Sequence, residues 1–212
     1  MTDGKNFPDG FFAREDEASD PEFYQLARKV VHIDDGAIEA VRQLYAEVLP
    51  PEGPILDLMS SWRSHLPNGL EGREVVGLGL NEEEMADNPQ LTRRVVHDLN
   101  QATALPFADE EFAAVVCSVS VQYMTRPIDT FREVRRILMS GGPFVVTFSN
   151  RCFPTKAIAA WRSLGDEDHK RLVALYFGRS GGWDDVTAVT RLEGVPGVRD
   201  PLYAVWARKA AG

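Results

Sequence analysis

Polar side chains gather at the ends of five short apolar runs of this 212-residue chain. They are Asp57 and Ser60, Asn81 after Gly79 and Leu80, Asp98 and Asn100 around Leu99, Ser118 followed by Gln122 and Tyr123, and Asn150. Carboxylates, hydroxyls and carboxamides can together hold a polar organic molecule through hydrogen bonds. Asp, Asn and Ser also cap helices, so each single position has a structural explanation as well. Taken as a series, these residues favour a binding cleft.

A second group of side chains lies upstream, where Tyr24, Arg28 and His32 recur every four residues. On a helix this spacing places them on one face. Arg28 could bind a carboxylate or a substrate, and His32 could accept a proton. The alternative is a solvated amphipathic face. His32 and Tyr123 are the candidate catalytic residues. The candidates for substrate or lid contacts are Tyr24, Arg28, Gln122 and Asn150.

The elements that must position these side chains follow from hydrophobic periodicity. Unbroken apolar runs, which are typical of buried parallel strands, lie at 54–59, 74–79, 94–98, 113–118 and 143–149. Helical spacing predicts helices at 22–31, 37–49, 128–138 and 154–164. The late runs 186–192 and 202–208 predict an antiparallel hairpin that closes one sheet edge. We therefore expect an α/β fold with a doubly wound, mostly parallel, seven-stranded Rossmann-like sheet that ends in this hairpin.

The same pattern suggests how the chain is divided. Residues 1–21 are rich in acids, glycine and proline, and we expect a loose N-terminal arm or a lid there. Residues 22–212 are expected to form a single domain, in which 22–50 make a helical cap. In a doubly wound sheet, ligands bind beyond the carboxyl ends of the strands, where the polar residues lie.

Composition excludes several classes of function. Acids outnumber bases 32 to 23, which argues against the basic face of a duplex nucleic-acid binder. No apolar run approaches the roughly 18 residues of a membrane span, and no secretory signal is visible. We therefore expect a soluble, cytoplasmic protein without a membrane or nucleic-acid partner. Cys117 and Cys152 make neither a disulfide framework nor a zinc site, so no metal is expected.

Two motifs carry a resemblance to a known family. Asp98-Leu99-Asn100 is followed by L-P-F-A-D-E-E-F at 105–112 and then by the apolar run to Cys117. Residues 131–138, F-R-E-V-R-R-I-L, are followed by Gly141-Gly142. Over about 54–150 the chain resembles a class I S-adenosylmethionine-dependent methyltransferase of the small-molecule type. The resemblance implies that fold, S-adenosylmethionine as cofactor and a small molecule as methyl acceptor.

The resemblance also implies a set of cofactor-binding residues. They are Asp57, Leu58, Met59, Ser60, Gly79, Leu80, Asn81, Asp98, Leu99, Asn100, Ser118 and Val119. Within this set, the Asp98 carboxylate or the Leu99 backbone is expected to accept the adenine amino group.

The chain departs from the family pattern at two strand ends. Asp57 matches the family's acid, but Met59, Ser61 and Arg63 replace the glycines of the following loop. Glycine permits positive φ and close approach to a ligand, so we expect a different loop path or a ligand placed further out. The acid that holds the ribose in the family is replaced by Gly79. Asn81 or a glutamate of 82–84 could compensate, although the glutamates could equally form a solvated first helical turn.

The loop at 59–67, M-S-S-W-R-S-H-L-P, resembles a branch of methyltransferase-like proteins with an L-D-L-M-S-S-W loop. Ser60 or Ser61 could cap a short helix beginning near Trp62. His65 could face the cleft or only stabilise the loop.

Three functions remain open at this point. The first is an active methyltransferase, and the second is a catalytically silent methyltransferase fold that retains cofactor or partner binding. The third, a nicotinamide oxidoreductase, would need G-x-G-x-x-G after the first strand, and that motif is absent.

Overall fold

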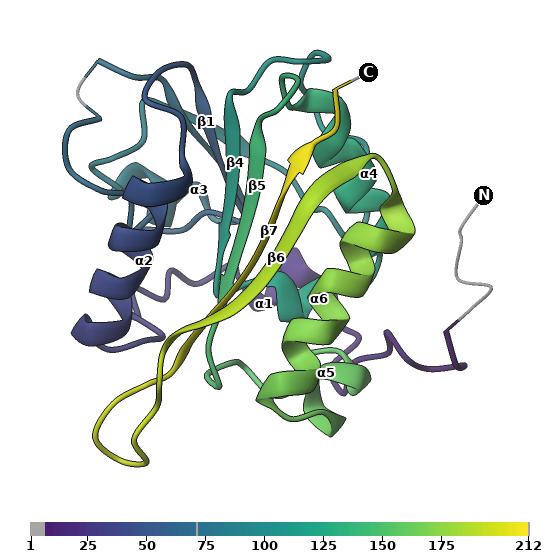
Figure 1. Cartoon of the computed structure of the whole chain (residues 1–212). Coiled ribbons are helices and arrows are strands. Elements are labelled where there is room, and N and C mark those ends of the chain that lie inside the picture. The colour runs from purple at the N-terminus through teal and green to yellow at the C-terminus, as the bar shows by residue number, and fades with distance from the viewer. Residues whose placement is uncertain (1–6, 71, 212) are drawn as a thin grey trace.

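The computed structural model describes residues 7–70 and 72–211 (Figure 1). Its centre is one seven-stranded sheet in the order β3-β2-β1-β4-β5-β7-β6. The strands are β1 Ile55–Leu58, β2 Val75–Gly79, β3 Arg93–Val96, β4 Ala114–Ser118, β5 Pro143–Phe148, β6 Trp183–Leu192 and β7 Leu202–Lys209. The first five run parallel, and β7 pairs antiparallel with both β5 and β6. The predicted α/β fold with its closing hairpin is confirmed.

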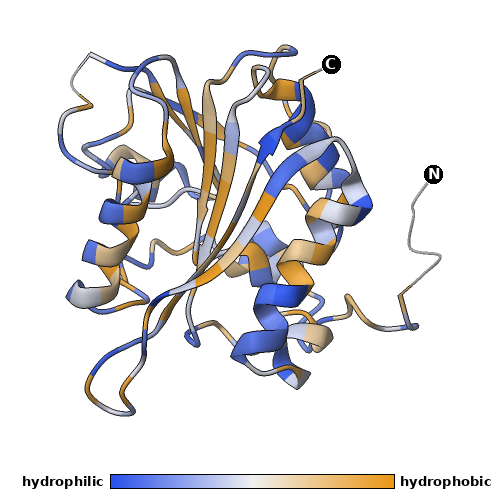
Figure 2. Cartoon of the chain, viewed as in Figure 1, coloured by the Kyte–Doolittle hydropathy of each residue, from blue (hydrophilic) through white to orange (hydrophobic). Residues whose placement is uncertain are grey.

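Helices cover both faces of this sheet, with α2 on one side and α4 and α6 on the other (Figure 1). The helices are α1 Asp20–Phe23, α2 Asp35–Val48, α3 Glu82–Ala86, α4 Pro127–Ile137, α5 Ala159–Ser163 and α6 Asp166–Ser180, with a 3₁₀ turn η2 at Val121–Tyr123. Successive residues of a strand enter opposite layers: Ile55 packs with Val41 of α2, and Leu56 belongs to the cluster that holds Phe131 and Phe177. Figure 2 shows apolar strands between helices whose outer faces are polar.

Burial on both faces explains the sequence of the central strands. Every residue of β1, β2 and β5 is buried, and an unbroken apolar run is the pattern such strands require. Asp57, in the middle of β1, departs from this pattern, because it carries a carboxyl group into this layer. The chain leaves β1 toward β2 and β3, and β4 toward β5, so the direction reverses between the neighbours β1 and β4. A crevice at this reversal is where such sheets bind ligands.

The segment before the sheet differs most from expectation. The predicted helix at 22–31 is wrong, because α1 ends at Phe23 and the chain then runs without helix to Asp34. Residues 7–21, expected as a loose arm, lie against the body of the protein. The amides of Ala159 and Ala160 donate to the carbonyls of Ala13 and Phe11, and Phe11 packs on the core. Residues 1–6 of that expected arm lie outside the described residues.

Smaller differences concern three other segments. Of the predicted helix at 154–164 only α5 forms, and α6 follows it without having been predicted. No helix begins near Trp62 in the described part of the loop after β1. The described residues contain no helix long and apolar enough to cross a membrane. Nor do they bring together a group of His, Cys, Asp or Glu side chains fit to hold a metal.

Candidate functional site

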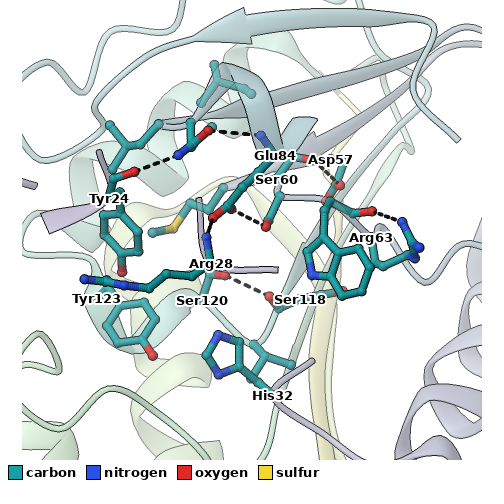
Figure 3. A pocket seen from close by; sticks show the side chains of 18 of the residues that line it. Tyr24, Arg28, His32, Asp57, Ser60, Arg63, Glu84, Ser118, Ser120 and Tyr123 are labelled. Carbon is teal, nitrogen blue, oxygen red and sulfur yellow. Dashed lines mark hydrogen bonds between the residues drawn. The ribbon is translucent and has the colours of Figure 1, made fainter. Parts of the chain in front are cut away.

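A pocket opens at the carboxyl ends of the parallel strands, and the irregular segment 24–33 forms one of its walls (Figure 3). Most of the residues singled out from the sequence meet there. They are Tyr24, Arg28, His32, Asp57, Met59, Ser60, Gly79, Leu80, Asn81, Asp98, Leu99, Asn100, Ser118, Val119 and Tyr123. Carboxyl ends of neighbouring parallel strands share one edge of the sheet, which is why residues so far apart in the sequence converge.

Three of the residues singled out do not line this pocket. Leu58 points into the core on the α4 and α6 side of the sheet. Gln122 is buried within η2, where its Nε2 donates to the Val119 carbonyl at 2.8 Å. Asn150 is exposed beyond the end of β5. Leu58 points away from the pocket because side chains alternate between the two faces of a strand, and Gln122 does so because it lies within the short η2 turn.

His65, which the sequence left open between the cleft and a role in the loop, lines the pocket. Other lining residues had no signal in the local sequence. Trp62, His97, Ser120 and Phe153 come from loops whose paths depend on the tertiary structure. Glu84 could be anticipated only in part. It belongs to the acidic run after β2, and its position three residues after the helix cap turns it inward.

The loop after β1 explains the unusual glycine pattern. Met59 has φ of +59°, the left-handed conformation that glycine adopts more easily. The Ser60 amide then donates to the Leu78 carbonyl at 2.8 Å, so the loop stays paired with β2. A Cβ atom on Gly79 would lie 2.2 Å from the Ser60 carbonyl oxygen. Gly79 is therefore required by this backbone contact, and no gap for a carboxylate exists there.

Asp57 lies beneath this loop and is buried. Its Oδ2 accepts hydrogen bonds from the hydroxyls of Ser60 and Ser64, both at 2.6 Å. Burial raises the pKa of Asp57 to about 6. The hydrogen bonds from the two hydroxyl groups act in the opposite direction and lower this pKa, but their effect is smaller. The carboxyl group therefore changes its charge close to neutral pH.

The first turn of α3 fastens the segment 24–33 to the sheet (Figure 3). Asn81 caps α3 by accepting from the Glu84 amide, and its Nδ2 donates to the Tyr24 carbonyl at 2.8 Å. The Glu84 carboxylate accepts from the Arg28 amide and from the Ser61 hydroxyl. A third attachment comes from the indole N–H of Trp62, which donates to the Val30 carbonyl at 2.9 Å.

The side chains of this segment face an aromatic end of the pocket. The Arg28 guanidinium lies 3.9 Å from the centroid of the Phe23 ring and 5.6 Å from that of Phe153. His32 meets Phe153 edge-on at 4.7 Å. Burial lowers the pKa of His32, although Glu84 opposes the change, so the imidazole is neutral at pH 7 and able to accept a proton.

Tyr123 has a different character. Its hydroxyl oxygen accepts from the Phe153 amide at 2.8 Å, and burial raises the pKa of Tyr123 to about 12. The neutral Tyr123 phenol therefore holds the Phe153 backbone through this hydrogen bond and does not act as a base. Of the two catalytic candidates, only His32 has the protonation state that proton abstraction requires.

The residues after β3 and β4 are partly structural. Asp98 Oδ1 accepts from the amides of Asn100 and Gln101, which is the capping alternative considered from the sequence. Asn100 donates to Asp20 at 2.7 Å and to the Tyr123 carbonyl at 3.0 Å. The Ser118 hydroxyl is 2.7 Å from that of the buried Tyr45. These hydrogen bonds fix the backbone at the edge of the pocket, and Asp98, Asn100 and Ser118 still line it.

Comparison with known proteins identifies the type of domain. A family model described as "Methyltransferase domain" matches residues 61–146. The fold is also that of the S-adenosylmethionine-dependent methyltransferase from Archaeoglobus fulgidus, with a TM-score of 0.61, 14% identity and 83% and 95% of the two chains covered. The corresponding enzyme from Mesorhizobium loti gives a TM-score of 0.52 and 20% identity, over 80% and 97% of the two chains.

Residues 61–146 therefore match a methyltransferase domain, and the chain is similar to class I methyltransferases. Among curated relatives, the biotin biosynthesis bifunctional protein BioHC of Teredinibacter turnerae is 26% identical over 132 residues, 62% of this chain and 21% of that protein. The chain spans about a fifth to a quarter of the length of the curated relatives it matches. The family match supports S-adenosylmethionine as the cofactor.

The pocket of this methyltransferase-like protein has the donors and acceptors that such a cofactor needs. The charged groups in its wall are the carboxyl groups of Asp20, Asp57, Glu84 and Asp98 and the guanidinium groups of Arg28 and Arg63. S-Adenosylmethionine carries a sulfonium cation together with hydroxyl and amino donors, so an excess of carboxylate acceptors suits it. The residues present therefore fit the cofactor.

Proposed function

We propose that this protein is an S-adenosylmethionine-dependent methyltransferase that acts on a small molecule. The observation that carries the proposal is the pocket at the switch point of the sheet, with the segment 24–33 fastened as one of its walls by Asn81, Glu84 and Trp62. A walled pocket suits a small acceptor better than a polymer, because a polymer needs an open surface groove.

The proposed cofactor contacts follow from the positions of the strand ends. Asp98 or the Leu99 backbone would accept the adenine amino group. Since Gly79 leaves no room for a carboxylate, the Glu84 carboxylate is the acid nearest in sequence that lines the pocket and would serve the ribose hydroxyls. The loop at Met59 and Ser60 would hold the methionine end.

The chemistry asks little of the protein beyond alignment. When bound, the cofactor would supply a methyl group on a sulfonium sulfur, and a bond from the acceptor atom to that carbon would form as the carbon–sulfur bond broke with its electron pair left on sulfur. Holding the reactants in line can account for much of the rate. Where the acceptor loses a proton, neutral His32 would take it.

Calorimetric titration of the full chain with S-adenosylmethionine and with S-adenosylhomocysteine tests the proposal. Both ligands should bind, and Asp98→Ala should weaken both about tenfold or more, roughly 1.4 kcal/mol. Asp168→Ala, a half-buried acid of α6 that pairs with Arg171 and does not line the pocket, is the matched control and should bind as the wild type does.

Three outcomes separate the hypotheses. Binding of both ligands together with methyl transfer to an acceptor supports the enzyme. Binding without transfer to any acceptor favours the catalytically silent alternative. If neither ligand binds the folded protein, the proposed cofactor site is wrong.

A further inference from the structure

The guanidinium group of Arg28 has no carboxylate partner among the described residues, although it lies over the Phe23 ring. It lines the pocket, and Figure 3 shows its side chain extending between the rings of Tyr24 and Tyr123. Its Nη1 is buried and has no hydrogen-bond acceptor. An unpaired buried donor of a charged group costs more free energy than a neutral one. This group therefore needs an acceptor that the chain itself does not supply.

The carboxylates closest along the pocket wall are already engaged. Asp20 is bound by Arg14 at 2.6 Å, by Lys156 at 3.3 Å and by the Asn100 amide. Glu84 accepts from the Arg28 backbone amide, not from the Arg28 side chain. Arg63, the other guanidinium in the wall, is satisfied differently, because its Nη1 donates to the Trp62 and Asp87 carbonyls.

The Arg28 guanidinium lies at the aromatic end of the pocket, 3.9 Å from the centroid of the Phe23 ring and 5.6 Å from that of Phe153. Tyr123 stacks on Phe153 with 6.2 Å between ring centroids, and His32 meets the same Phe153 edge-on. Tyr24, His32, Tyr123 and Phe153 all line the pocket. A cation without an anionic partner, in a pocket lined by these four rings, is complementary to a flat apolar molecule that carries an acidic group at one end.

We infer that the methyl acceptor is an aromatic carboxylate whose carboxylate pairs with Arg28 while its ring lies against Tyr123 and Phe153. The inference rests on the proposed function and specifies its substrate class. The carboxylate serves as an anchor, because pairing with a guanidinium reduces the nucleophilicity of its oxygens. The methyl group is then received by another atom of the acceptor.

The rival for Arg28 is the carboxylate of the cofactor's own methionine end, and the test separates the two. Benzoate and its neutral isostere benzamide are titrated into the full chain, with and without saturating S-adenosylhomocysteine. Benzoate should bind at least tenfold more tightly than benzamide. Arg28→Met should remove at least tenfold of the benzoate affinity and leave S-adenosylhomocysteine within twofold, while Arg28→Lys should keep part of the preference for the anion.

Arg171→Met is the matched control, since it removes an exposed guanidinium of α6 that pairs with Asp168 and does not line the pocket, and its benzoate affinity should be unchanged. Thermal unfolding of each variant verifies that it is folded. Equal binding of benzoate and benzamide, or no benzoate binding up to its solubility limit, overturns the inference. A loss of S-adenosylhomocysteine affinity in Arg28→Met that equals the benzoate loss also overturns it. Failure of S-adenosylhomocysteine to bind the wild type overturns the proposed function alone, because the benzoate comparison without it still decides the Arg28 site.

Discussion

Glu84 accepts a hydrogen bond from the backbone N–H of Arg28, a residue 56 positions earlier in the chain. The other carboxylate oxygen of Glu84 accepts from the Ser61 hydroxyl. One buried side chain of α3 thus joins the segment before the sheet to the loop after β1 at the edge of the pocket. The shape of the pocket depends on this junction.

Replacing Glu84 by Ala should loosen that junction. Hydrogen bonds to charged groups contribute about 1.5–3 kcal/mol, so the free energy of unfolding should fall by about that amount. Hydrogen exchange of the Arg28 amide should become faster. The control is Glu83→Ala, an exposed neighbour in the same helical turn, which should leave both measurements nearly unchanged. Unchanged protection of the Arg28 amide in Glu84→Ala would show that this contact does not hold the segment.

Gly79→Ala should destabilise the protein, because its Cβ would lie 2.2 Å from the Ser60 carbonyl oxygen and 3.1 Å from the Met85 sulfur. Forcing an atom into such a contact costs about 1–3 kcal/mol, which urea unfolding can measure. Gly178→Ala in α6 is the matched control. A Cβ there meets nothing within 4 Å, and the loss of a helical glycine should raise stability by about 0.5–1 kcal/mol. Equal stability of Gly79→Ala and the wild type would refute the close contact.

Asp57 makes stability depend on pH. Its pKa is about 6 in the folded protein, above the ordinary value of 3.8 for an aspartate, so the folded state holds the proton more tightly than the unfolded chain. The wild type should therefore lose stability as the pH rises from about 4 to about 6, and the loss should level off above that range. Asp57→Asn, whose side-chain oxygen can still accept from both serines, should lack this loss.

The advantage of Asp57→Asn over the wild type should thus grow by about 2–3 kcal/mol between pH 4 and pH 7. Urea unfolding at several pH values measures it. A difference between the two proteins that stays constant with pH would mean that Asp57 titrates normally.

Lys156 holds the N-terminal segment at residues 16–20 against the body of the protein. Its ammonium group is fully buried and contacts the carboxylates of Asp16 and Asp20, both at 3.3 Å, and the Ala18 carbonyl at 2.6 Å. Lys156→Met should cost about 3 kcal/mol or more, because it removes one of the two cations that pair with the buried Asp20 carboxylate and the donor to the Ala18 carbonyl. Limited proteolysis should then cut within 7–33 sooner than in the wild type.

Arg162→Met provides the comparison for this prediction. Arg162 pairs with Glu15 of the same N-terminal segment, but both side chains are substantially exposed. Exposed pairs contribute about 0–1 kcal/mol, so this variant should keep nearly all of the stability and the protease resistance. Equal effects of the two variants would show that burial of Lys156 adds nothing.

The strands were predictable because their signal is local. The run at 54–59 became β1 Ile55–Leu58, and 143–149 became β5 Pro143–Phe148. Strands covered on both faces are apolar at nearly every position, and this pattern is visible in consecutive residues of the sequence. The closing hairpin was equally accessible, because Gly and Pro separate its two runs.

The segment at 24–33 shows where local reasoning ends. The four-residue spacing of Tyr24, Arg28 and His32 indicated a helix, and the helix is absent, yet all three residues line the pocket. The backbone of this segment is bonded instead to Asn81, Glu84 and Trp62. Helical spacing cannot reveal such partners, because they come from other elements of the fold.

The sequence by itself determined the seven strands and their order along the chain, the edge of the sheet where polar residues collect, and the resemblance to methyltransferases. Each of these depends on residues that are neighbours in the chain. The tertiary structure alone decided that the Ser60 carbonyl occupies the space beside Gly79 and that the Glu84 side chain turns into the pocket. It also decided that the Arg28 guanidinium lies near aromatic rings with its buried Nη1 lacking a hydrogen-bond acceptor. These features arise from contacts between segments far apart in sequence, and only the packing of the folded chain brings their atoms within bonding distance.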